Sequence, residues 1–105
     1  MNLEELKESI ASKDGVLLYF WGDNCGVCET LRPKIKEAFS DNFPKIEQIY
    51  LNAKDNLEIS SHFGVFSIPT MIVFLDGKEF ARESRNVSIS QMVGKIERPY
   101  NIMLG

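Results

Sequence analysis

The two cysteines of this 105-residue chain, Cys25 and Cys28, lie three positions apart and are its only thiols. An apolar run at residues 16–21 precedes them and a segment with helical spacing at residues 29–39 follows, so we expect the pair where a strand ends and a helix begins. Two thiols one helical turn apart can close a small disulfide ring. The unpaired N–H groups and the dipole at a helix N-terminus favour a thiolate on the first of them. The spacing therefore predicts redox chemistry at this junction.

Two other interpretations of the cysteine pair stay open. The thiols could be buried and inert, or they could form half of a zinc site. Zinc usually takes four ligands, and beyond the two thiols only His62 is an obvious soft donor, so such a site would be partial or shared between two chains. In a reducing compartment, a pair of this kind is more often catalytic or metal-binding than structural. We predict a catalytic pair and no metal site.

Composition and charge indicate a globular protein and exclude several classes of partner. The chain has 44% hydrophobic and 26% charged residues and is long enough for one ordinary core, so we expect a single domain over residues 1–105. The net charge of −3 and the scattered basic residues provide no binding surface for nucleic acid or anionic lipid. No apolar run exceeds six residues, and residues 1–5 lack the features of a signal peptide, so we expect a cytoplasmic protein that does not enter a membrane.

The hydrophobic pattern predicts an α/β fold. Helices and strands are expected in the order α-β-α-β-α-β-β-α, at about residues 3–12, 16–21, 25–39, 46–51, 57–64, 71–75, 79–84 and 89–98. Pro33 should kink the second helix, and Pro99 should end the last one, so that residues 100–105 form an apolar tail that packs back or frays. A right-handed crossover makes the first two strands parallel, and Asp76-Gly77 turns an antiparallel hairpin. The product is a four-stranded mixed sheet with helices on both faces.

Several separated motifs resemble the thioredoxin superfamily, and they occur in that family's order. Phe20-Trp21 precedes Cys25-Gly26-Val27-Cys28 at the family's distance, and Pro33 falls where the family kinks its active-site helix. Ile68-Pro69-Thr70 is similar to the family's cis-proline loop, and Asp76-Gly77 falls at its last hairpin. The resemblance covers about residues 15–96, and it implies a thioredoxin-like fold and an exchange of electrons with protein disulfides.

The resemblance also implies roles for the residues of the site. Cys25 would attack a substrate disulfide, and Cys28 would resolve the mixed disulfide that forms. Pro69 would follow a cis peptide bond, which would let the backbone of Ile68 pair with an extended substrate segment. Trp21 would pack beneath the cysteines. The rim of a shallow, mostly apolar groove around Cys25 would consist of Asn24, Phe66, Ser67 and Ile68.

The partners that the resemblance implies are proteins. The substrates would be disulfide-containing proteins, and the electrons would come from a thioredoxin-reductase-type flavoenzyme or from another dithiol. No bound cofactor is needed, because the two thiols carry both electrons. A bare edge strand and an apolar tail are compatible with a monomer or a weak dimer.

Four departures from the family pattern affect what we expect of the chemistry. Asn24 and Val27 replace the family's usual tryptophan and proline, Tyr19 replaces a buried aspartate, and an N-terminal edge strand is missing. The N–H that Val27 restores can stabilise the Cys25 thiolate, so we expect a more oxidising couple than that of thioredoxin. Tyr19 provides no charged proton acceptor, so Cys28 should resolve the mixed disulfide more slowly. These departures keep a second function open, a non-enzymatic redox-sensing or partner-binding module.

Overall fold

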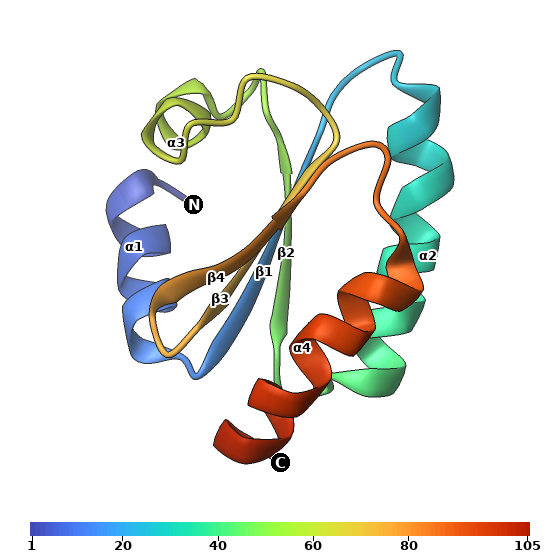
Figure 1. Cartoon of the computed structure of the whole chain (residues 1–105). Coiled ribbons are helices and arrows are strands. Elements are labelled where there is room, and N and C mark those ends of the chain that lie inside the picture. Colours follow the sequence, from blue (N-terminus) through green and yellow to red (C-terminus); the bar gives the residue numbers. More distant parts are fainter.

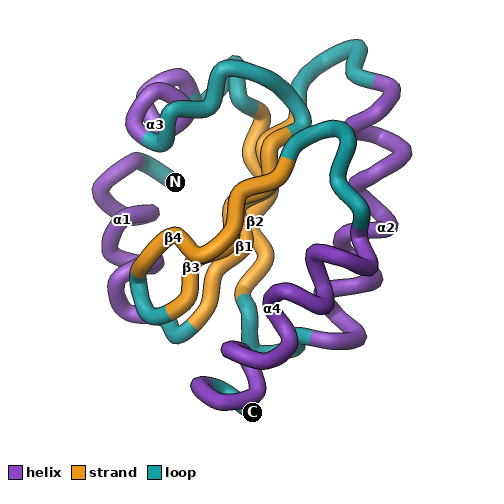
Figure 2. The backbone as a smooth tube through the Cα atoms, in the orientation of Figure 1, coloured by secondary structure: helices purple, strands orange, loops and turns teal.

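The computed structural model describes residues 1–105, which form a four-stranded sheet between two layers of helices (Figure 1). One layer consists of α1 and α3, and the other of α2 and α4 (Figure 2). The predicted architecture is confirmed. In chain order the elements are α1 (Leu3–Ser12), β1 (Gly15–Trp21), α2 (Gly26–Asn42), β2 (Glu47–Asn52), α3 (Leu57–His62), β3 (Thr70–Leu75), β4 (Lys78–Glu83) and α4 (Ile89–Met103).

The central strand β1 delivers the chain to the cysteine pair. The strand order is β2-β1-β3-β4, with β1 parallel to β2 and antiparallel to β3, and β3 antiparallel to β4. Because β1 is covered on both faces, its side chains alternate between two cores. Leu17 and Tyr19 enter the core under α2 and α4, whereas Val16, Leu18 and Phe20 enter the core under α1 and α3. The C-terminal end of β1 is therefore held rigidly where the cysteine loop begins.

Local capping and turn residues set the ends of several elements. Asn2 and Glu5 form a capping box at the start of α1, and the Ser88 side chain accepts a hydrogen bond from the Gln91 N–H at the start of α4. Asp76 and Gly77 both have positive φ angles, as a two-residue hairpin turn requires. None of the four helices combines the length and the apolar character needed to cross a membrane.

The prediction that Pro99 ends the last helix is wrong, because α4 continues to Met103. Proline at this position removes one backbone hydrogen bond, but the tertiary contacts beyond it offset that loss. The centre of the Tyr100 ring lies 4.9 Å from the centre of the Phe43 ring. The Tyr100 hydroxyl accepts a hydrogen bond from the Lys45 N–H. Leu104, the C-cap residue of α4, is buried. The tail therefore packs on the domain as a helical turn.

Candidate active site

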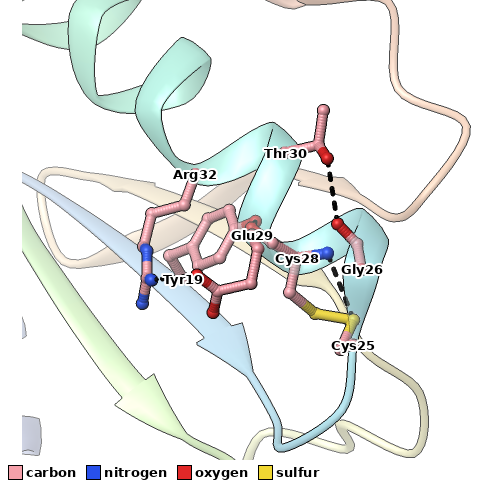
Figure 3. A network of polar contacts seen from close by, with 7 residues as sticks. All are labelled: Tyr19, Cys25, Gly26, Cys28, Glu29, Thr30 and Arg32. Atoms are coloured by element: carbon pink, nitrogen blue, oxygen red, sulfur yellow. Dashed lines mark hydrogen bonds and ion pairs between the residues drawn. A yellow bond between two sulfur atoms is a disulfide. The ribbon is translucent and has the colours of Figure 1, made fainter.

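The cysteine pair lies at the N-terminus of α2, and its two sulfurs differ in exposure. Cys25 is the N-cap residue of α2, and Cys28 lies in the first turn with its Cα 5.3 Å from that of Cys25. A disulfide joins them, and the Cys28 N–H donates a hydrogen bond to the Cys25 Sγ at 3.1 Å (Figure 3). Cys28 is fully buried, whereas Cys25 is partly exposed. Another disulfide can therefore reach Cys25 but not Cys28.

The structure does not gather further metal ligands around the pair. No three His, Cys, Asp or Glu side chains come together in an arrangement that could hold a metal ion. His62 lies exposed in the last turn of α3, with its ring edge-to-face against Phe63.

The residues around the cysteines form a turn with one special conformation. Asn24 has a φ of 55°, in the left-handed region that asparagine tolerates better than most residues. Gly26 and Val27, together with side chains further along α2, line an open hollow of about 430 Å³. The Gly26 carbonyl accepts a hydrogen bond from the Thr30 hydroxyl (Figure 3), which fixes the first turn of the helix.

Tyr19 is more than a packing residue, because its hydroxyl reaches the backbone of the second cysteine. The side chain is fully buried, and its O–H donates a hydrogen bond to the Cys28 carbonyl at 2.9 Å (Figure 3). Burial raises the pKa of Tyr19 to about 12, and burial also raises the pKa of the adjacent Tyr50. Tyr19 is therefore protonated at neutral pH, so its hydroxyl holds the Cys28 turn in place but cannot accept the Cys28 proton.

A charged pair lies beside the buried Tyr19 and the half-buried Tyr50. Arg32 and Glu29, on the first turns of α2, form an ion pair at 2.7 Å. The Arg32 guanidinium also lies 5.3 Å from the centre of the Trp21 ring. Trp21, the last residue of β1, is half-buried against the core under α2 and α4, and this cation lies over its ring.

The loop before β3 carries the predicted substrate-binding residues and lies next to the end of β1. The Ile68–Pro69 peptide bond is cis, Pro69 is buried, and the backbone N–H and C=O of Ile68 make no hydrogen bond within the protein. Ser67 and Phe66 are exposed. The close neighbour of this loop is Gly22, where an added Cβ would collide with the Ile68 side chain. The sequence analysis did not identify Gly22, although a glycine directly after a buried strand often marks a place where another segment packs closely against the backbone.

Arg82 anchors the loop from β4, and no sequence signal identifies it. Its guanidinium donates hydrogen bonds to the Phe63 carbonyl at 2.8 Å and the Gly64 carbonyl at 3.4 Å, and it pairs with Glu79 at 2.8 Å. The hydrogen bond from Arg82 lowers the pKa of Glu79. The carbonyls lie 19 and 18 residues away in the sequence, and backbone acceptors carry no side-chain signature. The base of the loop before β3 is thus tied to the edge strand β4.

We expect Arg82→Ala to loosen this loop without removing the fold. Loss of the guanidinium leaves two carbonyls without their donor, which should lower the free energy of unfolding by about 1 kcal/mol at this exposed position. Limited proteolysis should cut residues 63–67 faster, and urea unfolding should give the stability change. Glu79→Gln is the matched control, since it keeps both hydrogen bonds to the loop. Equal proteolysis of Arg82→Ala and the unaltered protein would rule out the anchoring role.

Comparisons of the sequence agree with this geometry. A family model described as Thioredoxin matches residues 1–98. The chain is 35% identical over 88 residues to the thioredoxin-like protein YdfQ of Bacillus subtilis (strain 168), which covers 84% of this chain and 78% of that protein. It is 31% identical over 81 residues to a thioredoxin of Mycoplasma genitalium, which covers 77% of this chain and 78% of that protein.

Solved structures extend the likeness to the backbone. Thioredoxin 1 from Thermosipho africanus TCF52B superposes with a TM-score of 0.73 at 31% identity, over 83% of this chain and 96% of that one. A mutant thioredoxin from Halobacterium salinarum NRC-1 superposes with a TM-score of 0.79 over 95% of this chain and 86% of that one. At 23% identity, the second likeness shows the fold alone.

Proposed function

Since the chain belongs to the thioredoxin family and is a protein thiol-disulfide oxidoreductase, we propose that it works as a reductant of protein disulfides. The observation that carries this proposal is the difference between the two sulfurs. The Cys25 sulfur is partly exposed at a helix N-terminus and accepts a hydrogen bond from a backbone N–H, whereas the Cys28 sulfur is buried one turn away. A single accessible sulfur with an internal partner is what a cycle of attack and resolution requires.

The proposed cycle begins with the dithiol form. The Cys25 thiolate, stabilised by the Cys28 N–H, attacks one sulfur of a substrate disulfide, and the other substrate sulfur leaves as a thiolate that takes a proton from water. Cys28 then loses its proton, and its thiolate attacks the Cys25 sulfur and displaces the second substrate thiolate. Two electrons pass to the substrate, and the Cys25–Cys28 disulfide forms.

A dithiol donor must return the pair to its reduced state. We assign this step to a thioredoxin-reductase-type flavoenzyme or to another dithiol protein, in line with the family. No bound cofactor takes part, because the two thiols carry both electrons. The reducing cytoplasm is the setting in which this direction of electron transport, and a contribution to redox homeostasis, would be sustained. All 105 residues would act as one domain in this role, as a monomer or a weak dimer.

The free backbone groups of Ile68 supply a docking edge for the substrate. Because neither group is paired within the protein, an extended segment can form a short β-pairing there beside Cys25. Pro69 follows Ile68 in this edge, and the exposed Ser67 and Phe66 precede it. We assign Asn24, directly before Cys25, to the same substrate contact.

Reduction of insulin by dithiothreitol, followed as turbidity, tests the proposal. An oxidoreductase that reduces proteins should shorten the delay before precipitation and increase its rate at micromolar concentration. A redox-sensing or partner-binding module would leave the time course close to that of dithiothreitol alone, and that result would contradict the proposed role.

We expect Val27→Pro to make the couple more reducing. The Val27 N–H has no partner within the protein and lies in the first turn of α2, the helix that Cys25 caps, so proline removes a donor that can stabilise the thiolate. A hydrogen bond to a charged group is worth about 1.5–3 kcal/mol. The reduction potential should therefore fall by roughly 30–60 mV. Equilibration with glutathione buffers measures this, Val27→Ala should stay near the starting value, and an unchanged or higher potential in Val27→Pro would refute the argument.

A further inference from the structure

The two outer strands of the sheet, β2 and β4, differ in how well their free edges are protected. Four of the six residues of β4 are charged, and a bulge interrupts its pairing with β3. In β2, residues 48–52 include no charged residue, proline or glycine, and the strand pairs with β1 in unbroken register. Charges and bulges are devices by which proteins prevent edge-to-edge pairing. The free edge of β2 is therefore the one open to another strand.

The hydrogen bonds of β2 show which of its backbone groups point outward. The Ala53 N–H donates to the Trp21 carbonyl at 2.8 Å, directly after the register pair Trp21 and Asn52. Because backbone groups alternate in direction along a strand, the odd-numbered residues of β2 bond to β1, whereas Gln48 and Tyr50 direct their N–H and C=O groups away from it. No strand lies on that side of β2. Each of these two residues therefore offers one donor and one acceptor.

The side chains of Gln48 and Tyr50 are held on one face of the sheet and leave this edge open. Tyr50 packs against the core under α2 and α4, and its hydroxyl donates a hydrogen bond to the Gln48 Oε1. The Gln48 Nε2 donates in turn to the Ser40 Oγ of α2 at 3.2 Å. Ile49 lies on the opposite face, partly buried against the core under α1 and α3. A second strand can therefore reach the backbone of β2, with Ile49 as an apolar contact beside it.

Two copies of this edge fit each other around a two-fold axis at Ile49. In that antiparallel register, Gln48 of each copy lies opposite Tyr50 of the other, so every outward N–H of these residues meets a carbonyl. Ile49 then faces Ile49 of the second copy as a non-hydrogen-bonded pair, the kind in which opposite side chains lie closest. The edge is therefore complementary to itself.

The charges beside the edge are compatible with this register. Glu47 lies opposite Leu51 of the second copy, and its carboxylate is already paired with Lys13 of its own chain at 2.7 Å. No like charges face each other along residues 47–51. A two-fold contact between identical surfaces is also the commonest arrangement in homo-oligomers.

We propose that two copies of the chain pair through the free edges of β2, which joins their two sheets into one. β1 runs parallel to β2, so each cysteine pair lies near the C-terminal end of β2 in its own chain. Because the two β2 strands run antiparallel, the cysteine pairs lie at opposite ends of the joined sheet. The dimer therefore keeps both exchange sites accessible.

Sedimentation and amide hydrogen exchange of the disulfide form test this pairing directly. Over a concentration series up to about 1 mM, where even weak association is populated, the sedimenting mass should double. When about nine tenths of the chains are paired, only the free tenth exchanges the outward amides, so exchange at Gln48 and Tyr50 should slow about tenfold. The Leu51 amide, which bonds to β1, should be protected equally at all concentrations. A protein that stays monomeric, or a dimer without this change at Gln48 and Tyr50, would overturn the inference.

Charge substitutions at the axis give a second test that a loss of folding cannot imitate. Ile49→Lys and Ile49→Glu each place two like charges opposite one another, so each variant alone should be monomeric at the concentrations where the unaltered protein pairs. An equimolar mixture of the two variants should recover the doubled mass, because the opposed charges are then of opposite sign. Either variant pairing alone as well as the unaltered protein would contradict the proposal, and so would a mixture of folded variants that stays monomeric.

Ile102→Lys is the matched control, because Ile102 is 74% exposed near the C-terminal end of α4 and does not belong to β2. It should pair as the unaltered protein does. A dimer that dissociates in Ile102→Lys but persists in Ile49→Lys would assign the contact to the apolar end of α4 and overturn the inference.

Discussion

Cys25→Ser should abolish disulfide exchange, with a loss of at least about 10³-fold, the scale on which removal of a catalytic nucleophile acts. Cys25 is the only sulfur that a substrate can reach, because Cys28 is fully buried. Serine has nearly the same shape, and its oxygen is protonated at neutral pH, so it can keep the N-cap hydrogen bond but cannot attack. The measurement uses the reduced protein and an aryl disulfide that releases a coloured thiolate at each of the two steps.

Cys28→Ser is the informative counterpart in the same assay. It should release one equivalent of coloured thiolate at close to the normal rate and then stop, because the mixed disulfide on Cys25 has no internal thiol to resolve it. Mass spectrometry should find the aryl group on Cys25. A Cys25→Ser protein that still released colour rapidly would show that Cys28 is accessible in solution, and the assignment of the two roles would be wrong.

Tyr19→Asp should speed the second step and destabilise the fold. The Tyr19 hydroxyl stays protonated because burial raises its pKa to about 12, so Cys28 must give its proton to water or to the departing thiolate. A carboxylate at this position supplies a base next to the Cys28 turn. We expect resolution to gain a factor at the low end of the ~10²–10⁴-fold range of general-base catalysis, with little change in attack by Cys25. The second coloured phase of the aryl disulfide assay reports this rate.

The stability cost of the same change follows from burial. Aspartate gives up the contact between the Tyr19 and Tyr50 rings, whose centres lie 5.4 Å apart, and places a charge in an apolar core. We expect a loss of about 3–5 kcal/mol in the free energy of unfolding, read from urea titration of the disulfide form.

Two control variants separate the roles of the Tyr19 side chain. Tyr19→Asn matches aspartate in size but provides no base, so it should be destabilised without faster resolution. Tyr19→Phe should lose only about 1 kcal/mol, because it removes the hydrogen bond to the Cys28 carbonyl and keeps the packing. If Tyr19→Asp and Tyr19→Asn resolve the mixed disulfide at the same rate, the absence of a base is not what limits this step in the unaltered protein.

Several features of the site could be predicted because their signals are local. The i, i+3 spacing of Cys25 and Cys28 after an apolar strand predicted a disulfide at a helix N-terminus, and the structure has one there. The Asp76-Gly77 turn was predictable for the same reason, since positive φ angles at both positions suit these residue types. The prediction at Pro99 failed because the local rule for proline ignores the burial of Tyr100 beyond it.

The sequence by itself determined the reacting groups and the layered α/β architecture, because spacing and hydrophobic periodicity act over a few neighbouring residues. Only the tertiary structure decided what surrounds those groups: the Tyr19 hydroxyl on the Cys28 carbonyl, the Arg82 hydrogen bonds at the base of the loop, and the hollow between Leu57 and Phe66. Each of these joins elements far apart in the chain. These side chains bond to backbone carbonyls or line a hollow, and neither feature can be recognised from the residue types in the sequence.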